Sequence, residues 1–182
     1  QNHGLGDAFL KRLLKRALVE AADSRLSAVE VDVADLHSAT VRREWQNIDI
    51  LIHDPENHLI CAIENKIDSG EHSEQLQRYR KIVEGEFPNE RVIFLFLTPE
   101  GDQPSDEAYI PISYALVADL VSAVRQNRES TLGPDVSTLM DHYATMLRRY
   151  IVSESEIAKL CRQIYGRHKQ ALDLIFEHRP DL

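Results

Sequence analysis

Hydrophobic and polar positions follow two different periods along this chain, and the change from one to the other predicts both helices and strands. Residues 5–22 carry apolar side chains at helical spacing, with lysine and arginine on the opposite face, which predicts an amphipathic helix. Residues 29–35 alternate valine with charged residues and are expected to form a half-buried strand. Residues 41–53 and 58–66 predict two further strands, joined by a turn over residues 54–57.

The second half of the chain continues the alternation of helix and strand. Residues 73–84 predict a helix, and residues 91–97 are apolar on both faces, which is typical of a central strand covered on both sides. A last short strand is expected at residues 109–114, where Pro111 confines it to a sheet edge. Helices are expected to follow at residues 115–127, 135–151 and 154–177, separated at Gly133-Pro134 and Ser153.

The order of these elements predicts the fold class. Three successive strands favour an antiparallel meander, whereas the helix between residues 66 and 91 is typical of a crossover to a parallel neighbour. We therefore expect an α/β fold with a mixed central sheet. A chain of 182 residues fits one domain, in which residues 1–114 form the core and residues 115–182 form a helical extension packed on it.

The net charge of −9 argues against a protein that coats nucleic acid without specificity. It does not exclude a nuclease, because a local basic patch acts at short range while salt screens more distant charges. No apolar run approaches the roughly 18 residues of a membrane span, and no secretory signal opens the chain. Cys61 and Cys161 lie far apart and form no metal-type pair. We therefore expect a reduced, cytoplasmic protein with no membrane partner.

Charged residues stand at the ends of two strongly apolar strands, where an unpaired charge costs free energy. Asp49 lies in the first of these strands, and Glu64, Asn65 and Lys66 end the next one. A hairpin that closes over residues 54–59 places Asp49 directly opposite Glu64, with Lys66 on the same face as Glu64. Two adjacent carboxylates repel each other unless a cation lies between them. Ligation by oxygen atoms alone favours Mg²⁺ or Mn²⁺.

The hairpin register also assigns the two faces of these strands, because a slip of one residue would bury the wrong set. The acids share their face with Leu51 and Ala62. The opposite face is expected to hold the remaining apolar side chains of the hairpin, namely Ile48, Ile50, Ile52, Cys61 and Ile63.

Gln75 and Tyr79 lie four residues apart on the next helix and therefore share one of its faces, with Arg78 near enough to reach a phosphate. Plainer explanations exist for each residue taken singly. Asp49 could cap a turn, Glu64 and Lys66 could form an ion pair, Tyr79 could be apolar filler, and Gln75 could be surface. His53 shares the predicted face with Asp49 and could lie near the site, but both His53 and His72 are expected to be structural or surface residues.

In this combination the residues resemble the PD-(D/E)XK nuclease superfamily. The D…ExK pattern matches at Asp49, Glu64 and Lys66, and the QxxxY element at Gln75 and Tyr79 resembles the RecB-like branch. The sequence around these motifs is similar to a bacterial stand-alone group of this superfamily. That group has an HGxGxxFL-like start, IDILI and IENKI strands, a QLxRY helix and a C-terminal pattern, seen here at residues 3–10, 48–52, 63–67, 75–79 and Tyr143…Tyr150.

The resemblance implies a restriction-endonuclease-like αβββαβ core and the hydrolysis of phosphodiester bonds, with DNA as the expected partner. It implies that Asp49 and Glu64 bind one or two Mg²⁺ (or Mn²⁺) ions together with the backbone carbonyl of Asn65. Lys66 would orient or deprotonate the attacking water, while Gln75, with Tyr79 on the same helix face, would help to hold the geometry around it.

The superfamily also uses a glutamate on its first helix. In the group resembled here, we expect this acid upstream of the HGxG-like segment, before the first residue of this sequence. Glu20, near the end of the predicted first helix, is the only glutamate on that helix. If the chain is truncated, the catalytic acid is missing and activity is expected to be weak or absent.

Three functions therefore stay open from the sequence. The leading hypothesis is a metal-dependent endo- or exodeoxyribonuclease. The alternative is a catalytically silent nucleic-acid-binding or assembly module on the same fold, favoured by the acidic charge and the missing acid. A third is a helical dimerisation protein, a homodimer in which residues 135–177 present an apolar face to a second copy. Metal binding at Asp49 and Glu64 separates the first two, and a concentration-dependent mass would support the third.

Overall fold

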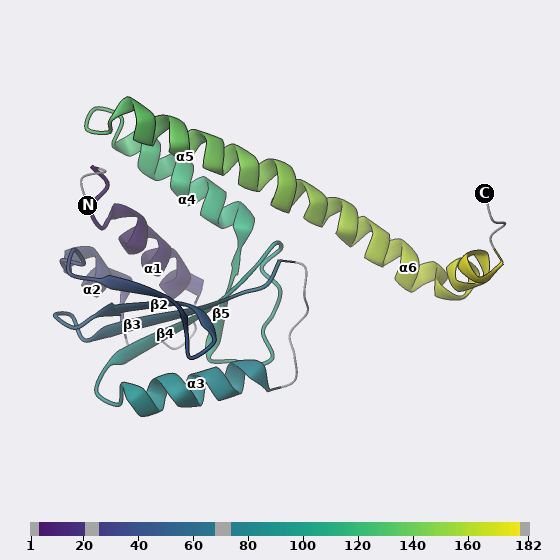
Figure 1. Ribbon diagram of the computed structural model, residues 1–182, viewed down its shortest axis with the longest axis horizontal. Helices are drawn as coiled ribbons and strands as arrows, with labels where there is room; N and C mark the ends of the chain where they lie inside the picture. The colour runs from purple at the N-terminus through teal and green to yellow at the C-terminus, as the bar shows by residue number, and fades with distance from the viewer. Residues whose placement is uncertain (1–3, 21–25, 68–73, 179–182) are drawn as a thin grey trace.

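The structure, a computed structural model, describes residues 4–20, 26–67 and 74–178. A single five-stranded sheet runs in the order β1-β2-β3-β4-β5, with helices against both of its faces (Figure 1). The described elements are α1 (Ala8–Glu20), α2 (Ala28–Val33), β1 (Thr40–Trp45), β2 (Ile48–Asp54), β3 (Leu59–Asn65), α3 (Gln75–Glu86), β4 (Arg91–Thr98), β5 (Tyr109–Ser113), α4 (Tyr114–Asn127), α5 (Pro134–Met146), the π-helix η1 (Leu147–Val152) and α6 (Ser153–Glu177).

The sheet is mixed, as the sequence predicts. β1, β2 and β3 form an antiparallel meander, whereas β3 pairs with β4, and β4 with β5, in parallel. The helix α3 connects β3 to its parallel neighbour β4, because parallel strands need a crossover connection. β5, which contains Pro111, lies at the edge of the sheet where proline is tolerated. The predicted α/β class with a mixed central sheet is therefore confirmed.

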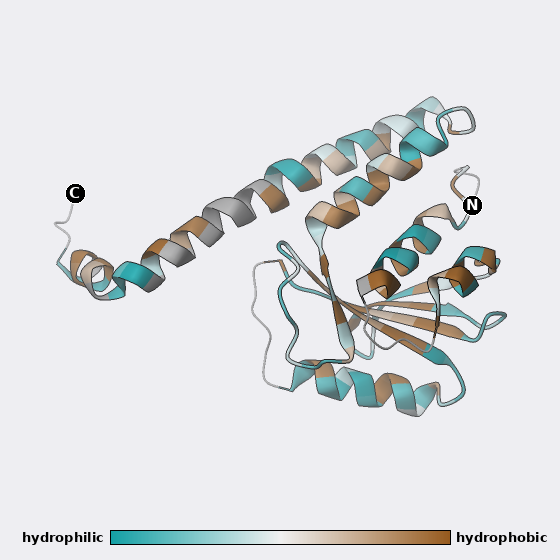
Figure 2. Cartoon of the chain, turned by 180° about the vertical axis from the view of Figure 1, so that it is seen from behind, coloured by the Kyte–Doolittle hydropathy of each residue, from teal (hydrophilic) through white to brown (hydrophobic). Residues whose placement is uncertain are grey.

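Two buried clusters cover the two faces of the sheet. One joins the sheet to α1, α4 and α5, and the other packs α3 against the opposite face. Between them, the central strands β3 and β4 are largely hydrophobic (Figure 2). The predicted hairpin register is confirmed, with Ile50 opposite Ile63 and Asp54 opposite Leu59.

Ile48 is an exception to the predicted faces. It packs in the α3 cluster with Leu51 instead of with Ile50 and Ile52. The β2–β3 pairing begins at Ile50, so the strict alternation of faces does not extend to Ile48.

The expected strand at residues 29–35 is wrong, because this segment forms the short helix α2. Ser27 begins it with a capping box: its hydroxyl accepts a hydrogen bond from the Glu30 N–H, and the Glu30 carboxylate accepts one from the Ser27 N–H. Of the three valines that alternate in the sequence, only Val31 is buried, at 2% exposure, while Val29 and Val33 face solvent. Alternation alone misled the prediction, since the serine–glutamate cap three residues apart signals a helix.

The expected single strand at residues 41–53 is also wrong. It is a hairpin of β1 and β2 that turns at Gln46 and Asn47, both with positive φ angles, 52° and 67°. Such angles are typical of tight hairpin turns, in which asparagine is favoured. The count of three strands before α3 nevertheless holds, because this hairpin supplies the strand that residues 29–35 do not form.

The C-terminal helices follow the prediction up to one point. Pro134 begins α5 directly after Gly133, but no break occurs at Ser153. Instead, η1 carries α5 directly into α6, and this helical rod extends beyond the sheet and is kinked at His168, where φ is −126° (Figure 1). α4 and α5 contribute Val121, Val124, Met140 and Ala144 to the same buried cluster as the sheet. The division into a core of residues 1–114 and a helical extension of residues 115–182 within one domain stays a prediction. Among the described helices, none is both long and apolar enough to cross a membrane.

Candidate active site

Glu64 is the centre of a polar constellation at the carboxyl end of β3. Its side chain is only 2% exposed, and its Oε1 atom lies 2.9 Å from the Lys66 ammonium. Gln75, the first residue of α3, donates a hydrogen bond from Nε2 to the same oxygen at 2.8 Å. Residues from a strand end and from a helix start therefore meet on one carboxylate oxygen. The ion pair that the sequence offered as a plainer explanation is present, and it is buried.

Asp49 reaches the same end of the sheet from β2. Its Oδ2 atom accepts a hydrogen bond from the backbone N–H of Asn65 at 2.7 Å. Asn65 follows Glu64 directly, so the two carboxylates are anchored on adjacent residues of β3. Because the paired register ends with Ile50 opposite Ile63, the next step along both strands brings Asp49 toward Glu64.

The helix α3 supplies the second half of the constellation. Gln75 Nε2 also donates to the Tyr79 hydroxyl at 3.0 Å, and Tyr79 is 4% exposed within the α3 cluster. Tyr79 is therefore both a core residue and a hydrogen-bond acceptor for Gln75. Arg78 is exposed, and its guanidinium lies 5.3 Å from the centre of the Tyr79 ring. The spacing of four residues thus places Gln75 and Tyr79 together, as predicted.

A buried carboxylate at this position is costly unless a cation and hydrogen-bond donors surround it. Lys66 and Gln75 supply both kinds of partner to Glu64. The charge of Glu64 also acts on its surroundings: burial, and then the negative Glu64, raise the pKa of the Tyr109 hydroxyl above its usual range. Tyr109 consequently stays a neutral donor, and it donates to the Leu76 carbonyl at 3.3 Å.

The donor set of this constellation fits a hard divalent cation. Asp49 and Glu64 offer carboxylate oxygens, the ligands that Mg²⁺ and Mn²⁺ prefer. The Oε1 atom of Gln75 is buried and has no hydrogen-bond partner among the described residues, so a further oxygen acceptor lies beside Glu64. A buried acceptor without a partner calls for an explanation such as a water or an ion.

A family model that describes the PD-(D/E)XK nuclease superfamily matches residues 1–167 of the chain. The chain belongs to the PD-(D/E)XK nuclease superfamily. No curated protein and no solved structure matches it. The family and the mixed sheet with its helices agree with the fold expected from the motif. Membership supports a nuclease, and nucleases of this superfamily generally use divalent metal ions.

Several residues considered from the sequence lie away from the PD-(D/E)XK constellation or outside the described residues. The His53 ring packs against the Phe87 ring at a tilt of 53°, with the centroids 5.2 Å apart, and Phe87 caps the C-terminal end of α3, whereas Gln75 lies at its N-terminal end. His53 therefore has the structural role expected of it. His3 and His72 lie outside the described residues, and Glu20 is the last residue of α1.

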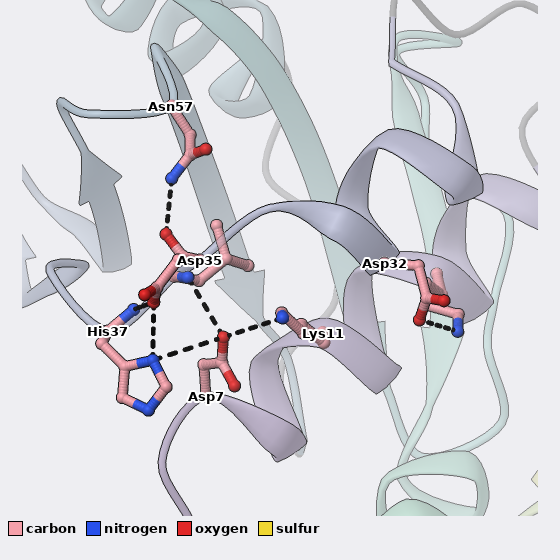
Figure 3. Close-up of polar contacts among 8 residues, drawn as sticks. Asp7, Lys11, Asp32, Asp35, His37 and Asn57 are labelled. Atoms are coloured by element: carbon pink, nitrogen blue, oxygen red, sulfur yellow. Dashed lines mark hydrogen bonds and ion pairs between the residues drawn. The ribbon is translucent and has the colours of Figure 1, made fainter.

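A second cluster of possible metal ligands, which sequence reasoning missed, joins Asp7, Asp35 and His37; we call it the N-terminal cluster (Figure 3). His37 Nδ1 lies 2.6 Å from Asp35 Oδ1 and 3.7 Å from Asp7 Oδ2. The same Asp7 oxygen accepts the Leu36 N–H at 3.1 Å and pairs with the Lys11 ammonium at 3.1 Å.

Gly6 helps to form the N-terminal cluster. A Cβ atom at this glycine would lie 2.7 Å from His37 Nε2, and its φ of +55° strains other residues. In the sequence, the glycines of the HGxG-like start could have pointed to the N-terminal cluster, since glycine indicates a close approach of the backbone to another group.

Proposed function

We propose that this chain is a Mg²⁺- or Mn²⁺-dependent phosphodiesterase, an endo- or exodeoxyribonuclease with DNA as its partner. Asp49, Glu64 and the backbone carbonyl of Asn65 would hold the metal. The observation that carries the proposal is the meeting of Lys66 and Gln75 on one buried oxygen of Glu64, while Asp49 is hydrogen-bonded to the next residue, Asn65. Membership of a nuclease superfamily supports the reaction class.

The protein residues have distinct roles in this proposal. When bound, the metal would lower the pKa of a water molecule and stabilise negative charge on the phosphate. Lys66 is held by Glu64 at 2.9 Å, so its ammonium has a fixed direction in which to orient the attacking water. Gln75, anchored on Tyr79, directs its remaining amide oxygen into the same region. Burial strengthens each of these electrostatic contacts.

The two cysteines bear on where the protein would act. Cys61 is buried and Cys161 is exposed, and both are free thiols. Free thiols fit a reducing compartment, so the cytoplasm is part of the same proposal.

The experiment compares two aspartates on one strand. Mn²⁺ binding is measured by calorimetry, and plasmid nicking by gel, for the wild type, Asp49→Asn, Glu64→Gln and the control Asp54→Asn. Asp54 is also a buried acid of β2, but its Oδ1 atom accepts N–H bonds from Glu56 and Asn57 in the turn. We expect binding and nicking in the wild type and the control, and loss of both in the other two variants.

A silent module on the same fold is the second candidate. Its support is that Lys66 and Gln75 already satisfy one oxygen of Glu64, as a purely structural ion pair would. A wild-type chain that binds no Mn²⁺ at millimolar concentration would favour this candidate and contradict the nuclease.

A homodimer through the C-terminal helices stays a proposal of its own. It is supported by exposed apolar side chains at helical spacing along α5 and η1: Leu139 at 68%, Tyr143 at 43%, Met146 at 37% and Tyr150 at 54% exposure. Sedimentation over a hundredfold range of concentration tests it, and a constant monomer mass would contradict it.

A further inference from the structure

Tyr114 connects the C-terminal helices to the candidate active site. It is the first residue of α4, directly after β5, and it is 7% exposed. Its hydroxyl donates a hydrogen bond to the Asn65 side-chain oxygen at 2.9 Å, across 49 positions of the sequence. A buried tyrosine normally finds such a partner for its hydroxyl. This partner is the residue that separates Glu64 from Lys66.

Asn65 links Tyr114 to Asp49 of β2. Its side chain is held by Tyr114, while its backbone N–H donates to Asp49 Oδ2 at 2.7 Å. The following residue is fixed as well, because the Lys66 N–H donates to the Leu97 carbonyl at 2.9 Å. Tyr114, Asn65 and Asp49 therefore form a chain of two hydrogen bonds that ends on a carboxylate of the site.

We propose that Tyr114 is a positioning residue of the candidate active site: it holds the Asn65 side chain, and thereby the Asn65 backbone that orients Asp49. The inference rests on the proposed function, since it concerns the geometry of the same metal site. It also gives a physical reason for asparagine between Glu64 and Lys66. An apolar residue at this position would leave the Tyr114 hydroxyl buried without its acceptor.

Tyr109 offers a matched control. It is also a buried tyrosine of the β5 region, at 3% exposure, and its hydroxyl donates to the Leu76 carbonyl at 3.3 Å instead of to Asn65. Each Tyr→Phe substitution thus removes one hydroxyl and one buried hydrogen bond. Only the Tyr114 substitution removes the bond that leads to Asp49.

The test is Mn²⁺ affinity measured by calorimetry, together with thermal unfolding, for the wild type, Tyr114→Phe, Tyr109→Phe, Asn65→Ala and the double variant of Tyr114 and Asn65. Tyr114→Phe should weaken Mn²⁺ binding by about threefold to tenfold, the range that one lost hydrogen bond produces. Tyr109→Phe should keep the wild-type affinity even if it unfolds at a lower temperature. The double variant should bind no more weakly than Asn65→Ala, because both changes break one chain.

Each outcome separates the inference from the proposed function. Wild-type affinity in Tyr114→Phe, or equal weakening in both phenylalanine variants, would overturn the positioning role and leave the metal site in place. Additive losses in the double variant would also overturn it, since the two residues would then act independently. A wild-type chain that binds no Mn²⁺ would overturn the proposed function itself, and the inference with it.

Discussion

The two ends of β3 carry two clusters that look alike as lists of residues but differ in structure. At the carboxyl end, Lys66 and Gln75 contact Glu64, and Asp49 accepts a hydrogen bond from the Asn65 N–H. At the amino end lies the N-terminal cluster, tied to the turn before β3 by a 2.7 Å hydrogen bond from Asn57 to the Asp35 carbonyl (Figure 3). Both clusters combine two carboxylates with basic side chains. Their surroundings decide what each can do.

The N-terminal cluster is exposed and already neutralised. Asp35 and His37 are 78% and 63% exposed, and the buried carboxylate of Asp7 is occupied by Lys11, His37 and the Leu36 N–H. A divalent cation would have to displace these partners in competition with water. At the candidate site, by contrast, Glu64 is buried and an amide oxygen of Gln75 lies beside it without a partner among the described residues. Burial and an open acceptor, more than the types of residue, therefore distinguish the candidate site from the N-terminal cluster.

The largest expected effect separates the two clusters by activity. Glu64→Gln keeps the shape of the side chain but removes the charge, so nicking should fall by at least about a hundredfold, as losses around metal sites do. Asp35→Asn, the matched change in the N-terminal cluster, should leave nicking unchanged. Initial rates on supercoiled plasmid at saturating Mn²⁺ measure both. Equal losses in the two variants would contradict the distinction.

The next effect is on stability, and it is expected in the N-terminal cluster instead of the candidate site. Asp7→Ala removes the acceptor for Leu36 and the partner of Lys11, which ties α1 to the segment after α2. We expect the free energy of unfolding to fall by about 1–3 kcal/mol, with Mn²⁺ affinity unchanged. Urea unfolding and calorimetry on one preparation measure the two quantities. A loss of Mn²⁺ binding in the folded variant would connect the clusters and break the comparison.

The smallest effect is a pH dependence of the N-terminal cluster. Burial raises the pKa of Asp7, but the Leu36 N–H, Lys11 and His37 together outweigh it and hold the pKa below the ordinary 3.8. An acid whose pKa is lowered by folding stabilises the protein above its unfolded pKa and loses that contribution as pH falls through the folded value. The stability deficit of Asp7→Asn should therefore be constant from pH 7 to about pH 5 and shrink below about pH 4. Urea unfolding across this range measures it, and a deficit that grows in acid would contradict the assigned sign.

The sequence predicts the candidate site better than it predicts its surroundings. Strand alternation and turn chemistry predict the β2–β3 register from Asp54–Leu59 to Ile50–Ile63 correctly, whereas the pairing of Asp49 with Glu64 stays a prediction. The spacing of Gln75 and Tyr79 follows from one helix turn. These contacts depend on local periods, which a single sequence displays. Their roles in a reaction stay predictions.

Contacts between distant segments could not be derived in this way. Tyr114 and Asn65 meet because β5 and β3 flank β4, a neighbour relation that no local period encodes. Asp7 and His37 likewise meet only because α1 and α2 pack together. The error at α2 has another cause. The alternating valines indicate a strand more strongly than the Ser27–Glu30 cap indicates a helix, because a helix of six residues is too short to show a clear helical period.

The two outer strands have a consequence for the protein in concentrated solution. A free strand edge is a template for adding strands from other molecules, which leads to aggregation. β1 ends the sheet on one side with exposed Arg42, Arg43 and Glu44, and β5 ends it on the other with Pro111, which lacks an N–H. Charge and proline both oppose edge-to-edge growth. The sheet is thereby protected from polymerisation, and crowded molecules would meet through their helices instead.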